Sequence, residues 1–155
     1  KTIVMIFAII VGALVFGYFA TLQQIPNALA NFVIENNIDR WIVFAMLMGV
    51  LLIMGMFLEV ISILMITMPI FYPLMIQLGF DGIWFAVVVT LNMELALITP
   101  PVGLNCYVIQ GLTNERLSIV LRGIIPFALI MATGLILFSI FPTLSTWLPS
   151  VMVGK

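Results

Sequence analysis

The stretch Asn92–Asn105 contains the residues whose types and spacing most clearly indicate chemistry, because two consecutive prolines interrupt it. A proline inside a helix has no N–H to donate, and its ring crowds the carbonyl four residues earlier. Pro100 and Pro101 each free one carbonyl in this way, and with Gly103 they predict that the helix unwinds locally instead of merely bending. Freed carbonyls are costly in hydrocarbon, and a bound cation is one partner that satisfies them.

Oxygen atoms beside this break could complete a sodium site. The Thr99 hydroxyl and the amide oxygen of Asn92 or Asn105 would supply an oxygen cage of the kind that sodium prefers. Broken helices with exposed carbonyls are the usual architecture of secondary-transporter sites. A kinked helix whose carbonyls are satisfied by a neighbouring serine or threonine is the alternative, and it stays open at this point.

Two carboxylates, Glu59 and Glu94, lie within apolar runs. An acidic side chain at the centre of a bilayer costs about 2.5–3.5 kcal/mol on insertion scales, so it usually faces a cavity or a partner. Either carboxylate could hold a cation, take up a proton, or pair with Arg122 or with an arginine outside this chain. Glu94 precedes Thr99 by about one and a half helical turns, so it need not face the break.

The composition of the chain places these groups inside a membrane. Of its 155 residues 65% are apolar and 7% are charged, whereas a soluble domain averages roughly 25% charged residues. A soluble enzyme or binding module is therefore excluded, and the formal net charge of −1 without a basic run argues against nucleic acid as a partner. The chain has no histidine, and its one cysteine, Cys106, has no second thiol, so neither metal ligation nor a disulfide is expected. We expect an all-α polytopic membrane protein or a piece of one.

Several segments must position the polar groups in that membrane. Residues 2–22 and 119–141 are predicted to span it, since a spanning helix needs roughly 20 mostly apolar residues. Residues 83–110 are also long enough, and they carry the double proline. Residues 23–40 are the most polar, and their apolar members at near-helical spacing favour a short amphipathic helix along the interface. An ordinary loop is the alternative for that segment.

The region 41–78 is predicted to form a re-entrant helical hairpin with its tip at about 55–62. The sequence around Glu59 has no Pro, Asn or Asp cluster that would mark a solvated turn. A tip that stays covered by protein or by a watery cavity needs no such turn. Two tight full spans are the alternative. Pro69 and Pro73, four residues apart on the second arm, are expected to bend that arm.

Basic residues indicate the orientation. The connection 111–122 contains Arg116 and Arg122, more arginines than any other connection, and is therefore expected to be cytoplasmic. The turn at 79–82 and the C-terminus would then lie on the opposite side. Trp147 suits an interfacial anchor near the end of the chain.

Four motifs in a fixed order resemble a known family: Leu52–Glu59 (LIMGMFLE), Pro69–Pro73 (PIFYP), Leu78–Asp81 (LGFD) and Thr99–Asn105 (TPPVGLN). Together they resemble the C-terminal part of the large membrane permease subunit, of the DctM type, of tripartite ATP-independent periplasmic (TRAP) transporters. The resemblance implies the ion-transporter superfamily fold with two inverted repeats. This chain would supply the hairpin and the broken helix of the second repeat, and it is expected to be the C-terminal fragment of a longer permease.

The same resemblance implies sodium-coupled uptake of organic acids, such as C4-dicarboxylates, across the bacterial inner membrane by an elevator-type movement. It implies a sodium site at the hairpin tip and the unwound stretch, formed by Gly55, Glu59, Thr99, Pro100, Gly103 and Asn105. We place Asn92 and Glu94 along the substrate path. Sodium would be the coupling ion, with no other metal and no organic cofactor. The implied partners are a small membrane subunit, a periplasmic substrate-binding protein, the organic acid and the lipid bilayer.

Two other functions remain open from the sequence. One is a proton-coupled carrier that uses Glu59 or Glu94, and the other is a structural membrane subunit that transports nothing. No nucleophile with an adjacent base and no phosphate-binding loop is present in the sequence, so no enzymatic activity is expected.

Overall fold

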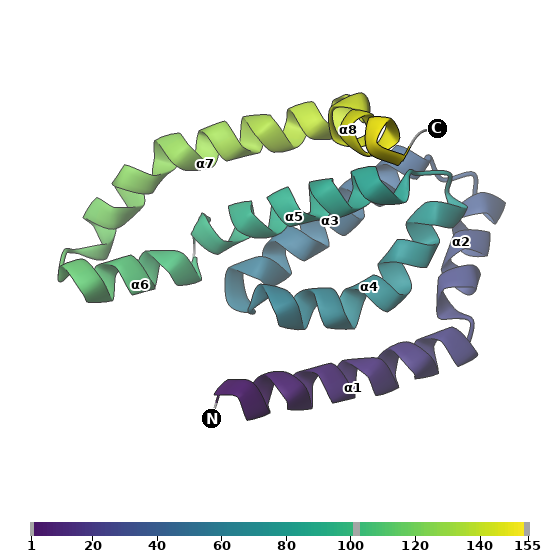
Figure 1. Cartoon of the computed structure of the whole chain (residues 1–155), viewed down its shortest axis with the longest axis horizontal. Coiled ribbons are helices and arrows are strands. Elements are labelled where there is room, and N and C mark those ends of the chain that lie inside the picture. The colour runs from purple at the N-terminus through teal and green to yellow at the C-terminus, as the bar shows by residue number, and fades with distance from the viewer. Residues whose placement is uncertain (1, 101–102, 154–155) are drawn as a thin grey trace. The chain divides into compact units, whose positions relative to one another are not determined.

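The chain is helical almost throughout in a computed structural model that describes residues 2–100 and 103–153 (Figure 1). Its helices are α1 (Thr2–Leu22), α2 (Ile25–Glu35), α3 (Arg40–Phe57), α4 (Val60–Gln77), α5 (Gly82–Ile98), α6 (Leu104–Thr113), α7 (Leu117–Ile140) and α8 (Thr143–Val153). No strand occurs in the described ranges. By length and apolar composition α3, α4 and α7 can each cross a membrane. The predicted class, an all-α polytopic membrane protein, is confirmed.

The start of α7 differs from its predicted position. The connection between α6 and α7 is only Asn114–Arg116, and Asn114 ends α6 in the left-handed conformation with φ of 55°. Arg122 lies in the second turn of α7, whereas the sequence analysis placed it in a loop. The helix begins earlier because the residues from Leu117 onward are apolar and compatible with a helix. Arg122 remains exposed near the helix start.

The polar segment contains a helix, α2, instead of an ordinary loop. Pro26, Ala30 and Val33 recur at helical spacing and are buried, whereas Asn27 and Asn31 are exposed. The face of α2 that carries these three buried residues is therefore the face that packs against the rest of the unit. Its position along the membrane interface stays a prediction.

Two compact units make up the chain, and each is described separately. The first unit contains α1, α2, α3 as far as Gly49, and Leu58–Gly82. The second contains Val50–Phe57 and the described residues from Ile83 onward.

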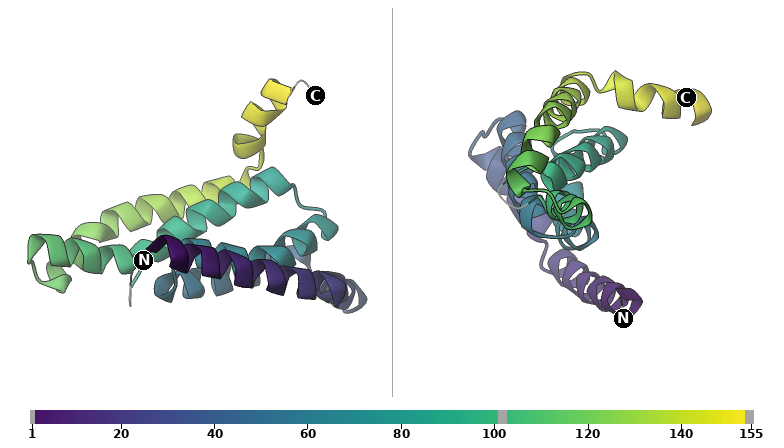
Figure 2. Two further views of the ribbon diagram at one scale, coloured as in Figure 1. Left: turned by 60° about the horizontal axis from the view of Figure 1, so that its bottom comes forward. Right: turned by 90° about the vertical axis from the view of Figure 1, so that its left-hand side faces the viewer.

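In the first unit α1 lies alongside α4 through a stripe of small residues (Figures 1 and 2). Ala13, Gly17 and Ala20 are spaced by four and three positions, and all three are buried. A Cβ atom built on Gly17 would lie 3.0 Å from Cγ of Pro69. Small residues at this spacing let the backbones of membrane helices approach closely, which is how such helices gain van der Waals contact. Pro69, inside the continuous helix α4, therefore packs against α1.

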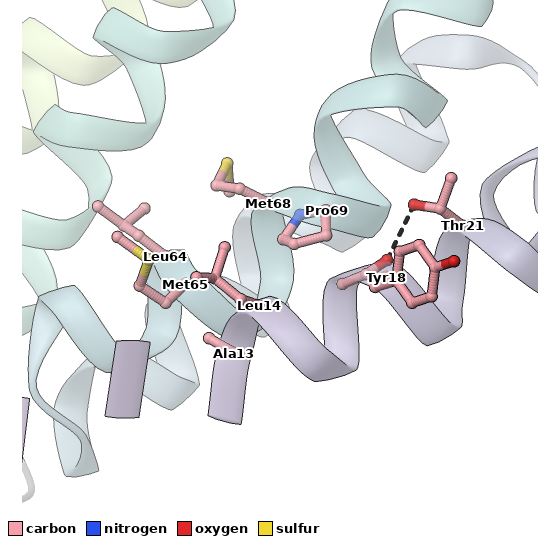
Figure 3. Close-up of a pocket in the computed structure, with 9 residues that line it drawn as sticks. Ala13, Leu14, Tyr18, Thr21, Leu64, Met65, Met68 and Pro69 are labelled. Atoms are coloured by element: carbon pink, nitrogen blue, oxygen red, sulfur yellow. Dashed lines mark hydrogen bonds between the residues drawn. The ribbon is translucent and has the colours of Figure 1, made fainter. Parts of the chain in front are cut away.

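Beside this contact the two helices leave an apolar groove of about 630 Å³ (Figure 3). Leu64, Met65 and Met68 of α4 line one side, and Leu14 of α1 lines the other. The Thr21 hydroxyl, at the edge of the groove, donates to the carbonyl of Gly17 at 2.8 Å within its own helix. The groove therefore offers mainly methyl and thioether groups.

A small core joins α2, α3 and α4 within the first unit. Ala30 and Val33 of α2 meet Val43 of α3 and Leu74 of α4, and all four are buried. Because the four side chains come from three helices, this core sets the position of α2 against α3 and α4.

An aromatic cluster holds the turn after α4 against the start of α3. Phe80 lies edge-on to Trp41 with ring centroids 5.2 Å apart, and its centroid is 5.8 Å from that of Phe44. The Arg40 guanidinium lies 5.3 Å from the centre of the Phe80 ring. Such cation–π contacts contribute about 0.5–1 kcal/mol at exposed sites. The Phe80 ring thereby stabilises the charge of Arg40 where α3 begins, next to the turn that follows α4.

In the second unit α5 is extensively buried. Its buried side chains are Trp84, Phe85, Val88, Val89, Asn92, Met93 and Ala96. All are apolar or amphipathic except one asparagine. The helices α6 and α7 pack against each other across their short connection (Figure 1).

We expect Gly17→Leu to destabilise the protein, because the new side chain would overlap the Pro69 ring and force α1 away from α4. Overpacking of this kind typically costs about 1–3 kcal/mol. Thermal unfolding of the detergent-solubilised protein measures the effect. Gly12→Leu is the matched control, because nothing lies within 4 Å of a Cβ atom on Gly12. Equal melting temperatures for the two variants would contradict the close packing.

Candidate functional site

The broken helix is the centre of the candidate site. The first half, α5, ends at Ile98, and the second half, α6, begins at Leu104, so the double proline does break the helix. Gly103 precedes α6 with φ of 50° and ψ of 78°, in the left-handed region. A Cβ atom there would lie 3.0 Å from the Cys106 sulfur and 3.2 Å from the carbonyl oxygen of Thr99. Both the backbone angle and the space therefore require glycine.

Protein donors satisfy several carbonyls at the end of α5. The Thr99 N–H donates to the carbonyl of Ala96 at 3.1 Å, which is one of the two carbonyls that the prolines free. The Thr99 hydroxyl donates to the carbonyl of Leu95 at 2.6 Å, and the Cys106 thiol donates to that of Ile98 at 3.6 Å. The backbone N–H of Thr99 thus satisfies one freed carbonyl, whereas its hydroxyl satisfies the carbonyl of Leu95, which the prolines do not free. Each carbonyl oxygen still has a second lone pair that a cation could use.

The other half of the double proline, Pro101, lies outside the described residues. Pro100 is exposed at the break, and Asn105 is exposed in the first turn of α6. Thr99, with its hydroxyl and its carbonyl both beside the break, is the residue best placed to contribute oxygen ligands.

Two residues expected along the substrate path have different surroundings. Asn92 is only 2% exposed in the middle of α5, whereas Glu94 is exposed. Residues that are two positions apart in a helix are separated by roughly 200° around its axis. Asn92 and Glu94 therefore do not share one face of α5, and Glu94 does not contribute to the surroundings of Asn92.

Glu59 lies between α3 and α4, at the tip of the predicted hairpin. It is the residue that caps α4: its Oε2 accepts a hydrogen bond from the Ser62 N–H at 3.4 Å and from the Ser62 hydroxyl at 3.1 Å. A carboxylate at a helix N-terminus is favoured because the first N–H groups of a helix lack partners and carry partial positive charge. The sequence analysis considered Arg122 as its partner, and Ser62 was missed. Glu59 and Ser62 are three residues apart at the start of an apolar helix, and this capping pattern in the sequence could have predicted the contact.

The residues of the predicted sodium site belong to both units. Gly55 is buried near the end of α3 and belongs to the second unit, as do the residues of the break, whereas Glu59 belongs to the first. Their assembly into one ion site stays a prediction. The thiol of Cys106, for which no role was expected, supports the carbonyl at the end of α5.

Comparison with known proteins gives the family. The model of the DctM component of the tripartite ATP-independent periplasmic transporter matches residues 1–144. No solved structure matches the chain.

Relatives of known assignment agree with this match. The C4-dicarboxylate TRAP transporter large permease protein DctM of Pseudomonas aeruginosa is 37% identical over 97% of this chain and 35% of its own length. The protein of the same name from Vibrio cholerae is 31% identical over 99% of this chain and 34% of its own. The sialic acid TRAP transporter permease protein SiaT of Haemophilus influenzae is 29% identical over 89% of this chain and 22% of its own. The chain thus spans about a third of the length of the first two relatives. Since the family model covers nearly all of it and the motif resemblance agrees, this chain belongs to the DctM component family of tripartite ATP-independent periplasmic transporters.

Proposed function

We propose that the permease containing this chain takes up small organic acids by sodium-coupled secondary transport across the bacterial inner membrane. Membership of the family supports this, as do the relatives named for C4-dicarboxylate and sialic acid transport. The chain spans about a third of such a permease, so the activity belongs to the whole protein. This chain would contribute the second hairpin and the second broken helix.

The break between α5 and α6 carries the proposal. The C-terminal end of α5 and the N-terminal end of α6 both lie beside Gly103. The C-terminal end of a helix carries roughly half a negative charge and favours cations, and the N-terminal end carries the opposite charge and favours anions. One break thus offers an environment for a sodium ion and for a carboxylate.

The chemistry of the residues fits this division. Thr99, at the α5 end, provides a hydroxyl oxygen and a carbonyl oxygen as ligands for a cation. The N-cap of α6 is Gly103, which has no side chain to act as a cap, and the N–H of Cys106 donates to the carbonyl of Gly103. The N–H groups of Leu104 and Asn105 are therefore the ones proposed to bind a carboxylate of the substrate. Glu59, Gly55, Pro100, Gly103 and Asn105 would complete or shape the sodium site.

The relatives also suggest the substrate class and the partners. The first relatives are named for C4-dicarboxylates, so a C4-dicarboxylate or a related carboxylate is the proposed substrate. A tripartite transporter implies two further components, and we propose a small membrane subunit and a periplasmic substrate-binding protein.

Sodium replacement tests the coupling. We expect uptake of radiolabelled succinate by the complete transporter, reconstituted in proteoliposomes with its small subunit and binding protein, to fall to background when choline replaces sodium at a fixed pH gradient. Uptake that continues without sodium and collapses when the pH gradient is dissipated would favour the proton-coupled carrier.

Gly103→Ala tests the break itself. The left-handed backbone costs a residue with a Cβ about 1–2 kcal/mol, and the methyl would also press on Cys106 and on Thr99. We expect succinate uptake to fall about tenfold or more, since each 1.4 kcal/mol corresponds to a factor of ten.

Gly111→Ala is the control for that substitution, because it lies in the same helix, α6, and nothing lies within 4 Å of a Cβ atom there. It should leave uptake unchanged. Full uptake by Gly103→Ala, with the subunits still assembled, would instead favour a structural subunit.

Two substitutions of Glu59 distinguish a role in capping α4 from a role in carrying a proton. Glu59→Gln keeps an oxygen that can accept from the Ser62 N–H, so we expect it to retain most of the succinate uptake. Glu59→Ala removes the cap, which costs roughly 0.5–2 kcal/mol, and should lower both thermal stability and uptake. Loss of uptake in Glu59→Gln at unchanged stability would show that the charge of the carboxylate is needed beyond capping; a raised sodium requirement would then assign it to the sodium site, and an altered pH dependence to proton transfer.

A further inference from the structure

The carbonyl of Phe138, near the end of α7, lacks its ordinary helical donor. In an α-helix the N–H of the residue four positions later would donate to it, and that residue is Pro142, which has no N–H. The N–H of Phe141 is already used, because it donates to the carbonyl of Leu137 at 2.9 Å. The Phe138 carbonyl therefore needs a donor from another element.

That donor is the indole of Trp84. Its Nε1–H donates to the carbonyl oxygen of Phe138 at 2.7 Å, and the side chain is 1% exposed. An indole has one N–H and accepts no hydrogen bond, so it matches a single vacant acceptor. A donor at the C-terminal end of a helix is also favoured by the partial negative charge there.

This hydrogen bond joins two helices of the second unit whose bonded residues are 54 positions apart in the sequence. Trp84 lies in the first turn of α5, and α5 carries the break at its other end. A continuous helix of 17 residues transmits the position of one end to the other. We propose that Trp84 is a positioning residue, whose indole pins the start of α5 to the end of α7 and thereby fixes where Thr99 lies along the helix axis.

The effect of Trp84 on transport rests on the proposed function, whereas the attachment of α5 to α7 through Trp84 does not. Three variants of the complete permease separate the two. Trp84→Phe keeps an aromatic ring and removes the N–H. Pro142→Ala supplies a backbone N–H that reaches the Phe138 carbonyl when α7 extends past Phe141, which now lies outside the helix with φ of −113° and ψ of 79°. The double variant combines both changes.

Stability and position should respond differently in these variants. Trp84→Phe should lower the melting temperature by a few degrees, because it leaves a half-buried acceptor, the Phe138 carbonyl, without this donor. In the double variant the melting temperature should recover, since the new N–H satisfies that acceptor. The position of α5 should not recover, because the hydrogen bond from the indole to α7 is still missing.

Spin labels report that position directly and without transport. Thr90 of α5 and Thr133 of α7 are both exposed, so cysteines placed there in a Cys106→Ser background can be labelled. We expect a narrow distribution of label-to-label distances with Trp84 present. We expect a broad one in Trp84→Phe and in the double variant.

Transport gives the functional readout. With succinate as the probe, the sodium concentration for half-maximal uptake should rise several-fold in Trp84→Phe and stay raised in the double variant. Trp147→Phe, which removes an exposed indole on α8, is the control and should change nothing.

Two results would overturn the proposal: an unchanged distance distribution in Trp84→Phe, or full recovery of both distance and uptake in the double variant. The latter would mean that the indole only satisfies a carbonyl. Wild-type uptake that ignores sodium would contradict the proposed function, and the spin-label distances would then still decide the role of Trp84.

Discussion

Each backbone carbonyl in hydrocarbon must accept a hydrogen bond, and proline removes the donor that a helix would supply. The arrangement of the second unit follows from how this requirement is met at two points. At the end of α5 the donors are local, since Thr99 turns its own N–H and hydroxyl back onto the helix. At the end of α7 the donor comes from another helix, through Trp84. The first solution shapes the break, and the second ties the broken helix to its neighbour.

The sequence was sufficient to predict structure where the interactions involve residues close together in the chain. Pro100 and Gly103 predicted the break correctly, because a missing N–H and a glycine act on the backbone within one turn. The donors to the freed carbonyls were less accessible, since Thr99 can point its hydroxyl to ligands or back along the helix. For Glu59 the sequence left a cation, a proton and a distant arginine open, and helix capping by Glu59 toward Ser62, three residues away, was not considered. The bond from Trp84 spans 54 positions, and no periodicity or motif encodes such a pairing.

Packing in the first unit shows a second limit of sequence patterns. Burial of apolar surface does not bring helices together when lipid is equally apolar, so close fit has to do so. Gly17 and Pro69 achieve that fit by placing a ring against bare backbone. The neighbouring groove is the counterpart of the same contact, because larger side chains such as Leu14 and Met65 stand on either side of it. Neither is visible in a hydropathy profile, which records how apolar each residue is and not which side chains fit together.

The bond between Trp84 and Phe138 also constrains the path of the chain through the membrane. It connects the first turn of α5 to the last turn of α7, so the beginning of one helix and the end of the other lie at the same depth. The chain that leaves through α5 and α6 must therefore come back through α7, which makes the number of crossings between these two points even. Whichever compartment receives the entry to α5 also receives the start of α8. A single accessibility label at either place consequently reports the sidedness of both.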